Sequence, residues 1–138
     1  MQFNWNGRTY NHDISQYKVS SVDGKSSLHV RAYNILRALF KFDTICQEVP
    51  AYGTRSFIDL YLPNKRLAIE CQGQQHYEQN NFFHKSKTDF IHGQVKDKVK
   101  KSWCEANDIT LVCLDYRETD EQWTRAVLGY GPSSASEA

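Results

Sequence analysis

Apolar residues recur at helical spacing in two segments of the chain. The first segment carries a stripe of Leu28, Ala32, Ile35, Leu36, Leu39 and Phe40. The second carries a stripe of Ile91, Val95, Val99 and Trp103. Because an α-helix turns once in about 3.6 residues, spacings of three and four place each stripe on one helical face. Two amphipathic helices are predicted, and a third, short helix is predicted to follow the capping box formed by Thr119 and Gln122.

Short apolar segments, separated by turns rich in Pro, Gly and Asn, occupy the middle of the chain. Strands are predicted at residues 44–49, 56–62 and 66–72. Their short connections indicate an antiparallel meander. Residues 109–114 form a nearly continuous apolar run, which is typical of a strand that is buried on both faces.

The first ten residues have a pattern of their own. Asn6-Gly7 lies between aromatic and β-branched residues, which is the strongest short-range indication of a β-hairpin. Residues 1–25 are therefore assigned to a hairpin and connector, residues 26–130 to one domain, and residues 131–138 to a flexible tail. Within that domain, the order of helix, three strands, helix, strand and helix predicts an α/β fold, with a mixed sheet flanked by helices.

Composition limits the partners more than it identifies them. The 138 residues include 17 Lys and Arg against 16 Asp and Glu, so no global positive field favours nucleic acid. Any basic surface must be local, and six lysines between residues 85 and 101 could provide one, or could simply form a solvated helix face. No apolar run is long enough to span a membrane, and the chain does not start like a signal peptide, so a cytoplasmic protein is expected.

The cysteines add little chemistry. None of the four belongs to the close pair that a structural zinc site normally contains. They are interpreted as small buried apolar side chains in a reducing compartment. The four are Cys46, Cys71, Cys104 and Cys113.

Two carboxylates on neighbouring predicted strands are the clearest candidate for chemistry. Asp59 lies on one strand and Glu70 on the next, and both strands are otherwise apolar. By strand alternation, Asp59 should share a face with Tyr61, whereas Ile58 and Leu60 should point the other way. Two carboxylates held close together repel each other, and a hard cation such as Mg²⁺ removes the repulsion and can hold a phosphate. A metal-dependent site that cuts phosphodiesters is therefore predicted.

The order of these motifs resembles a known superfamily. The segments are FIDLYLP at residues 57–63, IECQGQQH at residues 69–76 and DKVK at residues 97–100. Together they look like the PD-(D/E)xK nuclease superfamily, and within it most like the branch of the very-short-patch-repair endonucleases and phage homing endonucleases of EDxHD type. The resemblance covers residues 27–114. It implies a restriction-endonuclease-like α-β-β-β-α-β core.

The resemblance also implies roles for individual residues at the carboxylate pair. Asp59 and Glu70 match the acids that bind Mg²⁺, with Mn²⁺ as a substitute, and the backbone carbonyl of Cys71 matches a further metal ligand. Gln72 occupies the position where the superfamily motif has its lysine. It is interpreted as a residue that supports the site or contacts phosphate.

Three further residues are candidates for proton transfer or metal binding. His76 can replace the missing lysine, since an imidazole titrates near neutral pH and can act as general acid or base. Asp97 would orient His76 or complete the metal shell. Glu48 corresponds to the leading acid of the branch, although relatives often carry that acid on the first helix, where this chain has His29.

The predicted function is a Mg²⁺-dependent DNA endonuclease of nicking or homing type, derived from a phage. DNA is the expected partner, no membrane is expected, and a homodimer is left open. Two alternatives remain. One is a structure-specific nuclease that resolves junctions with the same site. The other is a non-catalytic DNA-binding or assembly protein that retained the fold, for which Gln72 in place of lysine is the best argument.

Overall fold

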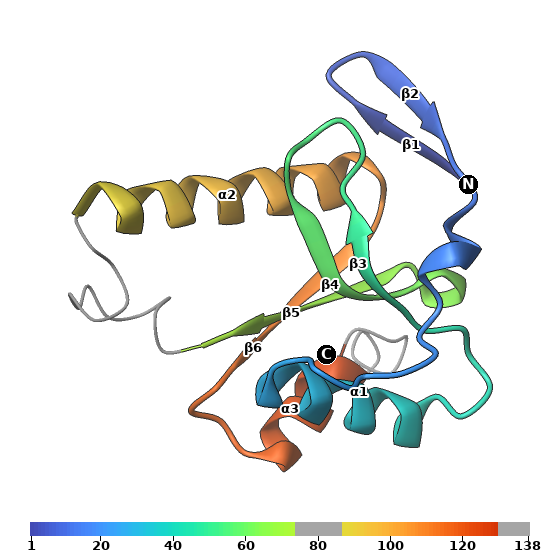
Figure 1. Cartoon of the computed structure of the whole chain (residues 1–138), viewed down its shortest axis with the longest axis vertical. Coiled ribbons are helices and arrows are strands. Elements are labelled where there is room, and N and C mark those ends of the chain that lie inside the picture. Colours follow the sequence, from blue (N-terminus) through green and yellow to red (C-terminus); the bar gives the residue numbers. More distant parts are fainter. Residues whose placement is uncertain (74–86, 130–138) are drawn as a thin grey trace.

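The structure is a computed structural model that describes residues 1–73 and 87–129, with side chains described for residues 1–73 and 97–129. The predicted tail and His76 therefore lie outside the described residues. A four-stranded mixed sheet forms the centre, with α1 and α3 on one side and α2 on the other (Figure 1). The predicted α/β class and N-terminal hairpin are confirmed.

The sheet follows the predicted meander. Its strands are β3 (Cys46–Pro50), β4 (Phe57–Leu62), β5 (Leu67–Gln72) and β6 (Thr110–Asp115). The first three pair antiparallel, and β6 pairs parallel with β5, which gives the order β3-β4-β5-β6. A short 3-10 helix, η2 (Pro63–Lys65), makes the turn between β4 and β5.

In the part of the chain that the structure describes, three α-helices cover the sheet, and two of them begin at polar caps that the sequence specifies. The helices are α1 (Ser27–Leu39), α2 (Lys87–Ala106) and α3 (Asp120–Leu128). The side chain of Ser26 accepts a hydrogen bond from the His29 N–H at the start of α1. Thr119 and Gln122 form the predicted capping box of α3. Among the described helices, none is long and apolar enough to cross a membrane.

Each side of the sheet has its own hydrophobic cluster. Beneath α1 and α3, the buried members are Ala32, Leu36, Ile45, Leu60, Leu62, Leu67, Ile69, Leu114, Trp123 and Val127. Beneath α2, the cluster includes Cys46, Val49, Ile58, Tyr61, Ala68, Trp103 and Cys104. Burial of these side chains on both sides is the main contribution to stability, because each removes apolar surface from water.

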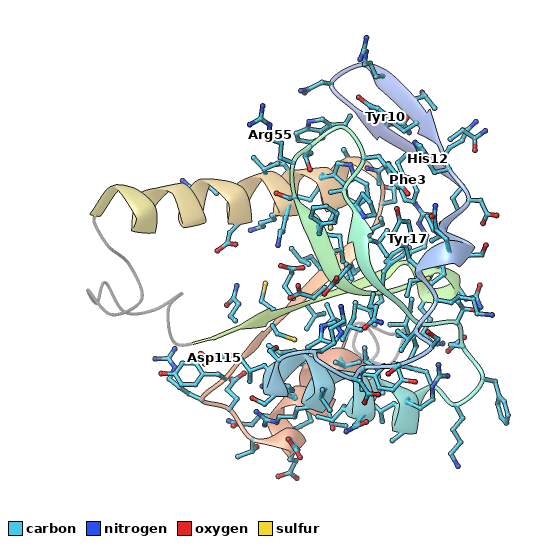
Figure 2. The ribbon with its side chains drawn as sticks, in the orientation of Figure 1. Phe3, Tyr10, His12, Tyr17, Arg55 and Asp115 are labelled. Atoms are coloured by element: carbon cyan, nitrogen blue, oxygen red, sulfur yellow. The ribbon has the colours of Figure 1, made fainter. Side chains whose placement is uncertain are left out.

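The N-terminal hairpin packs onto the second of these clusters. Its strands are β1 (Gln2–Trp5) and β2 (Arg8–Asn11), joined by two residues with positive φ, as the Asn-Gly turn requires. Phe3, which is labelled in Figure 2, is fully buried and stacks on Tyr52 and Trp103. A 3-10 helix, η1 (Ile14–Tyr17), then leads towards α1.

Two predictions about burial were wrong. β6 is an edge strand with Thr110 and Cys113 exposed, so it is not buried on both faces, and Cys113 is not a buried cysteine. Cys46 and Cys104 are buried as predicted, whereas Cys71 is only partly buried.

Strict alternation along β4 was also wrong. Ile58 belongs to the same cluster as Tyr61, whereas Leu60 belongs to the other cluster. The pattern changes at Asp59, at the level where Glu48 of the neighbouring strand has a positive φ of 51°. A left-handed residue in one strand turns the chain, so the side chains beyond it face the opposite way.

Candidate active site

Asp59 and Glu70 meet where β4 and β5 cease to pair through their backbones. The last paired residues are Leu60 and Ile69, so the two acids lie at the next level of the antiparallel register. Here side chains replace the backbone ladder. The Asp59 N–H donates to Glu70 Oε2 at 2.8 Å, and the Cys71 N–H donates to Asp59 Oδ2 at 2.9 Å. Each carboxylate is therefore held by the strand of the other.

Lys100 reaches the same place from α2. Its Nζ lies 2.6 Å from Glu70 Oε1, and the side chains of the two residues are only 18% and 9% exposed. Both oxygens of Glu70 are thus engaged, one by Lys100 and one by the Asp59 N–H. By contrast, Asp59 Oδ1 accepts no hydrogen bond from any residue that the structure describes. The three side chains form one compact group of two acids and a base.

Burial and the neighbouring charge make Glu70 an unusual acid. Burial raises the pKa of Glu70 to about 7, the negative charge of Asp59 adds to the rise, and Lys100 partly offsets it. For Lys100, burial lowers the pKa, but attraction to Glu70 and Asp59 outweighs burial, so its pKa is raised. Lys100 therefore remains a cation at neutral pH, while Glu70 can gain or lose a proton there.

The remaining described residues that were predicted for the site lie at different distances from the two carboxylates. Gln72 ends β5 two residues after Glu70, and it is half-buried. Asp97 lies one turn before Lys100 on α2, and its charge is one of the influences that raise the pKa of Lys100. Glu48 is exposed, and its Oε2 forms an ion pair at 2.7 Å with Lys25 Nζ. Its side chain thus binds a surface lysine, although its backbone lies at the level of Asp59.

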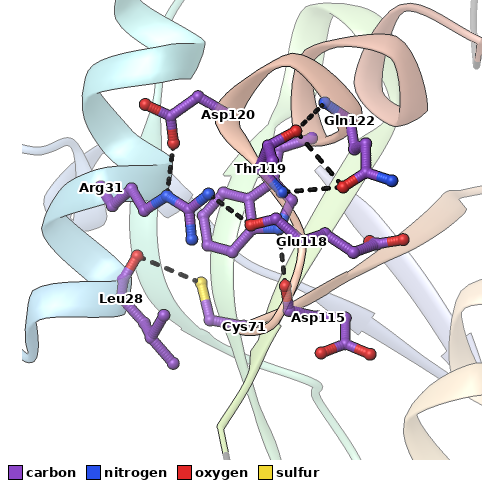
Figure 3. Close-up of polar contacts among 9 residues, drawn as sticks. Leu28, Arg31, Cys71, Asp115, Glu118, Thr119, Asp120 and Gln122 are labelled. Carbon is purple, nitrogen blue, oxygen red and sulfur yellow. Dashed lines mark hydrogen bonds and ion pairs between the residues drawn. The ribbon is translucent and has the colours of Figure 1, made fainter.

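The N-terminal turn of α1 crosses the sheet at the same level. His29 Nε2 lies 2.8 Å from Gln47 Oε1 on β3, while the Cys71 thiol on β5 approaches the Leu28 carbonyl at 3.7 Å (Figure 3). The Gln47 amide also donates to the Ser21 carbonyl at 3.0 Å, so its oxygen must face His29 and His29 must carry its proton on Nε2. The first turn of α1 therefore spans the strands on both sides of Asp59.

Arg31 fixes α1 to α3 near the carboxyl ends of β5 and β6. Its guanidinium donates to the Asp120 carboxylate and the Glu118 carbonyl, and it lies 3.7 Å from the ring centroid of Trp123 (Figure 3). The Trp123 indole donates in turn to the Asp115 carbonyl. These contacts hold the helix that carries His29 in place beside the candidate site.

Comparisons with known proteins point to viruses. No protein-family model matches the chain, and no solved structure matches it with significance. The chain is 34% identical over 67 residues to uncharacterized protein 033L of Invertebrate iridescent virus 3, and 38% identical over 63 residues to uncharacterized protein 307L of Invertebrate iridescent virus 6. These matches cover 49% and 46% of the chain, which spans only 34% and 32% of the two viral proteins.

A longer match is to uncharacterized protein 094L of Frog virus 3. The identity is 31% over 121 residues, which cover 84% of the chain and 77% of the frog virus protein. The chain belongs to the 094L family.

In this member of the 094L family, sequence reasoning gave two residues near the carboxylates too small a role. In the sequence, Lys100 is the basic residue one turn after Asp97, and its pairing with Glu70 joins positions 30 residues apart. The spacing of Asp97 and Lys100 on one helical face was the available indication. The sequence places His29 at the start of the first predicted helix, where a histidine is expected at the surface or in a cap, but its side chain is buried. A histidine beside an apolar stripe gave no indication of its partner.

Proposed function

We propose that this protein is a metal-dependent DNA endonuclease whose active site is built on Asp59, Glu70 and Lys100. The observation that carries the proposal is the 2.6 Å pair of Lys100 and Glu70 beside a second carboxylate. Hydrolysis of a phosphodiester needs an activated water and relief of the charge that develops on the phosphoryl oxygens. Two acids and one fixed cation in a half-buried group are suited to both tasks.

The chemistry of the donor set fits a divalent cation. The negative charge of Asp59 contributes to the raised pKa of Glu70, and a cation beside both acids would remove that repulsion. The described residues contain no group of three or more His, Cys, Asp or Glu side chains suited to a metal. Mg²⁺ needs fewer, because it keeps several waters and uses one or two carboxylates. Asp59, Glu70 and the Cys71 carbonyl would hold it, and it would lower the pKa of a bound water.

Lys100 takes the part that the superfamily motif gives to the residue at Gln72. Its raised pKa keeps it cationic, so it can hold a phosphoryl oxygen or an attacking water by a charge-assisted hydrogen bond. Gln72 can then support the same site as a neutral donor. His76 and Asp97 keep their proposed roles in proton transfer, and Glu48 remains a weaker candidate because it pairs with Lys25.

The relatives are viral proteins, which supports a virus-encoded protein. Action on DNA in the host cytoplasm, with a phage as one source, is part of the proposal. One observation favours a second function, a non-catalytic DNA-binding protein. Both oxygens of Glu70 are already engaged by protein groups, so a metal must share them. A protein that had lost its metal could be held together by Lys100 in this way.

Plasmid cleavage separates the two functions. Supercoiled plasmid is incubated with the protein and Mg²⁺, Mn²⁺ or EDTA, and nicked and linear products are separated on a gel. We expect cleavage with either metal and none with EDTA. Asp59→Asn, Glu70→Gln and Lys100→Met should each lower the rate at least about a hundredfold, because each removes a charge next to the reacting phosphate.

The matched control is Glu121→Gln, which neutralises an exposed acid on α3. It should cleave like the native protein. Circular dichroism of each variant shows whether the fold is intact. If the protein binds plasmid and branched-junction DNA but cleaves neither with any metal, the nuclease function is rejected and the non-catalytic DNA-binding function takes its place. Cleavage of the junction alone would establish a junction-resolving nuclease.

A further inference from the structure

The two edges of the sheet are protected to different degrees. β3 forms one edge, and three features block it: Glu48 has a positive φ, Pro50 has no N–H to donate, and Lys18 forms a bridge with Cys46. Such features prevent another strand from pairing with an edge. β6 forms the other edge, and among residues 1–73 and 87–129 it pairs with β5 alone.

The β6 edge has none of these protective features. Residues 110–114 of the strand read Thr-Leu-Val-Cys-Leu, with no charge and no proline. Thr110 and Cys113 are exposed, and Leu111 and Val112 are only partly buried. Asp115 follows as the last residue of the strand. A regular, exposed edge that is uncharged over five residues is a template for another strand.

A hollow of about 420 Å³ lies between this edge and α2. It is lined by Lys101, Cys104, Glu105, Ile109, Leu111 and Cys113. The apolar residues form its floor on the strand side. On the helix side, Lys101 and Glu105 are exposed and one turn apart, and neither forms an ion pair with any residue that the structure describes. The surface thus combines a strand edge with one unpaired charge of each sign.

We propose that β6 pairs antiparallel with β6 of a second copy of this chain. A two-fold axis normal to the sheet makes the two strands antiparallel, and it also sets the two α2 helices antiparallel on the same side. Lys101 of each copy then faces Glu105 of the partner subunit. The patch is therefore complementary to itself in charge, and the one charged residue of β6, Asp115, lies at the end of the strand, where it forms an ion pair with Arg117.

The proposed dimer does not depend on the proposed nuclease activity, but it would set the distance between the two active sites. Glu70 lies beside Cys113 in the register of β5 and β6, so the candidate site is one strand away from the shared edge. Measured across the strands, the two sites of a dimer would then be three strand spacings apart, roughly 14 Å, and the register of the two β6 strands would set their offset along the strands. A pair of sites on one continuous sheet is suited to a substrate with two closely spaced phosphodiesters.

Charge exchange tests the interface. Analytical ultracentrifugation of the full chain at about 100 µM should show a species of twice the 16.1 kDa chain mass. Lys101→Glu and Glu105→Lys should each weaken the dimer about tenfold or more, because the two-fold axis repeats each like-charge contact. The double variant should restore it. Lys98→Glu, an exposed lysine on the same helix outside the hollow, should leave it unchanged.

Cross-linking gives a second measurement that does not require charge variants. Cys113 is the exposed one of the four cysteines, and it lies on the proposed edge. A short bis-maleimide should convert the native dimer into a covalent one, and Cys113→Ser should abolish the product. A monomer at all concentrations would overturn the proposal. So would a dimer that survives both single charge reversals, or a cross-link that persists without Cys113.

Discussion

Two pairs of lysine and glutamate in this protein have nearly the same geometry and very different surroundings. Lys25 and Glu48 approach to 2.7 Å with side chains 26% and 55% exposed. Lys100 and Glu70 approach to 2.6 Å with side chains 18% and 9% exposed. Water screens the first pair, so it contributes little to stability. In the second pair, the attraction between the two charges must offset the free energy that is lost when both are removed from water.

The buried pair also has a third charge beside it. Burial and the carboxylate of Asp59 together raise the pKa of Glu70 to about 7, even though Lys100 acts in the opposite direction. A pair selected only for stability would not have a second acid at its side. Perturbed pKa values of this origin are typical of functional sites. The contrast therefore supports a chemical role for Glu70 more strongly than for Glu48.

The largest expected effect is on the free energy of unfolding when each lysine is removed. At about pH 8, Lys100→Met should cost about 3 kcal/mol, because Glu70 then has no counter-ion and must either stay charged in a buried position or take up a proton. Lys25→Met should cost less than about 1 kcal/mol. Urea denaturation of both variants measures the difference. Equal losses would mean that the two pairs are equally solvated, and that the contrast drawn from their burial is wrong.

The pH dependence of stability should distinguish the two glutamates by a smaller amount. The pKa of Glu70 is raised from 4.5 in the unfolded chain to about 7 in the folded protein, so the folded state binds the proton more tightly. Its contribution to stability is complete below about pH 4.5 and is lost as the pH rises through about 7. Relative to Glu70→Gln, the native protein should lose on the order of 2 kcal/mol between about pH 5 and about pH 8.

Glu48→Gln is the control for this measurement. It removes the exposed acid and should keep the dependence on pH that the native protein shows. Thermal or urea unfolding at several pH values gives both curves. A native protein whose stability follows that of Glu70→Gln across this interval would show that Glu70 has an ordinary pKa.

Most of the fold was predictable because periodicity reports local structure. The stripe of α1 predicted a helix over the correct residues, and the Asn6-Gly7 turn predicted the hairpin. An apolar run does not report how many neighbours a strand has, so the sequence predicts a strand buried on both faces where the structure has β6 at an edge. The sequence likewise does not predict the positive φ of Glu48, because glutamate rarely adopts a positive φ.

The two acids are the part of the candidate site that the sequence predicts. Asp59 and Glu70 could be brought together because a tight meander fixes which residues oppose each other. Lys100 could not be placed in the same way, since its contact with Glu70 depends on how α2 packs on the sheet. The pairing of His29 with Gln47 also depends on how a helix packs on the sheet. Contacts across elements therefore required the structure, whereas contacts within the meander did not.

The smallest expected effect is the response of the two pairs to salt. A double-mutant cycle of Lys25→Met and Glu48→Gln should give a coupling energy of about 0.5 kcal/mol at low salt, which falls towards zero near 1 M NaCl, where the screening length is about 3 Å. The corresponding cycle of Lys100→Met and Glu70→Gln should keep most of its coupling energy, because buried charges are screened by salt much less than exposed ones. Coupling energies that fall together would show that water reaches Glu70 as freely as Glu48, and would remove the physical reason for treating the two acids differently.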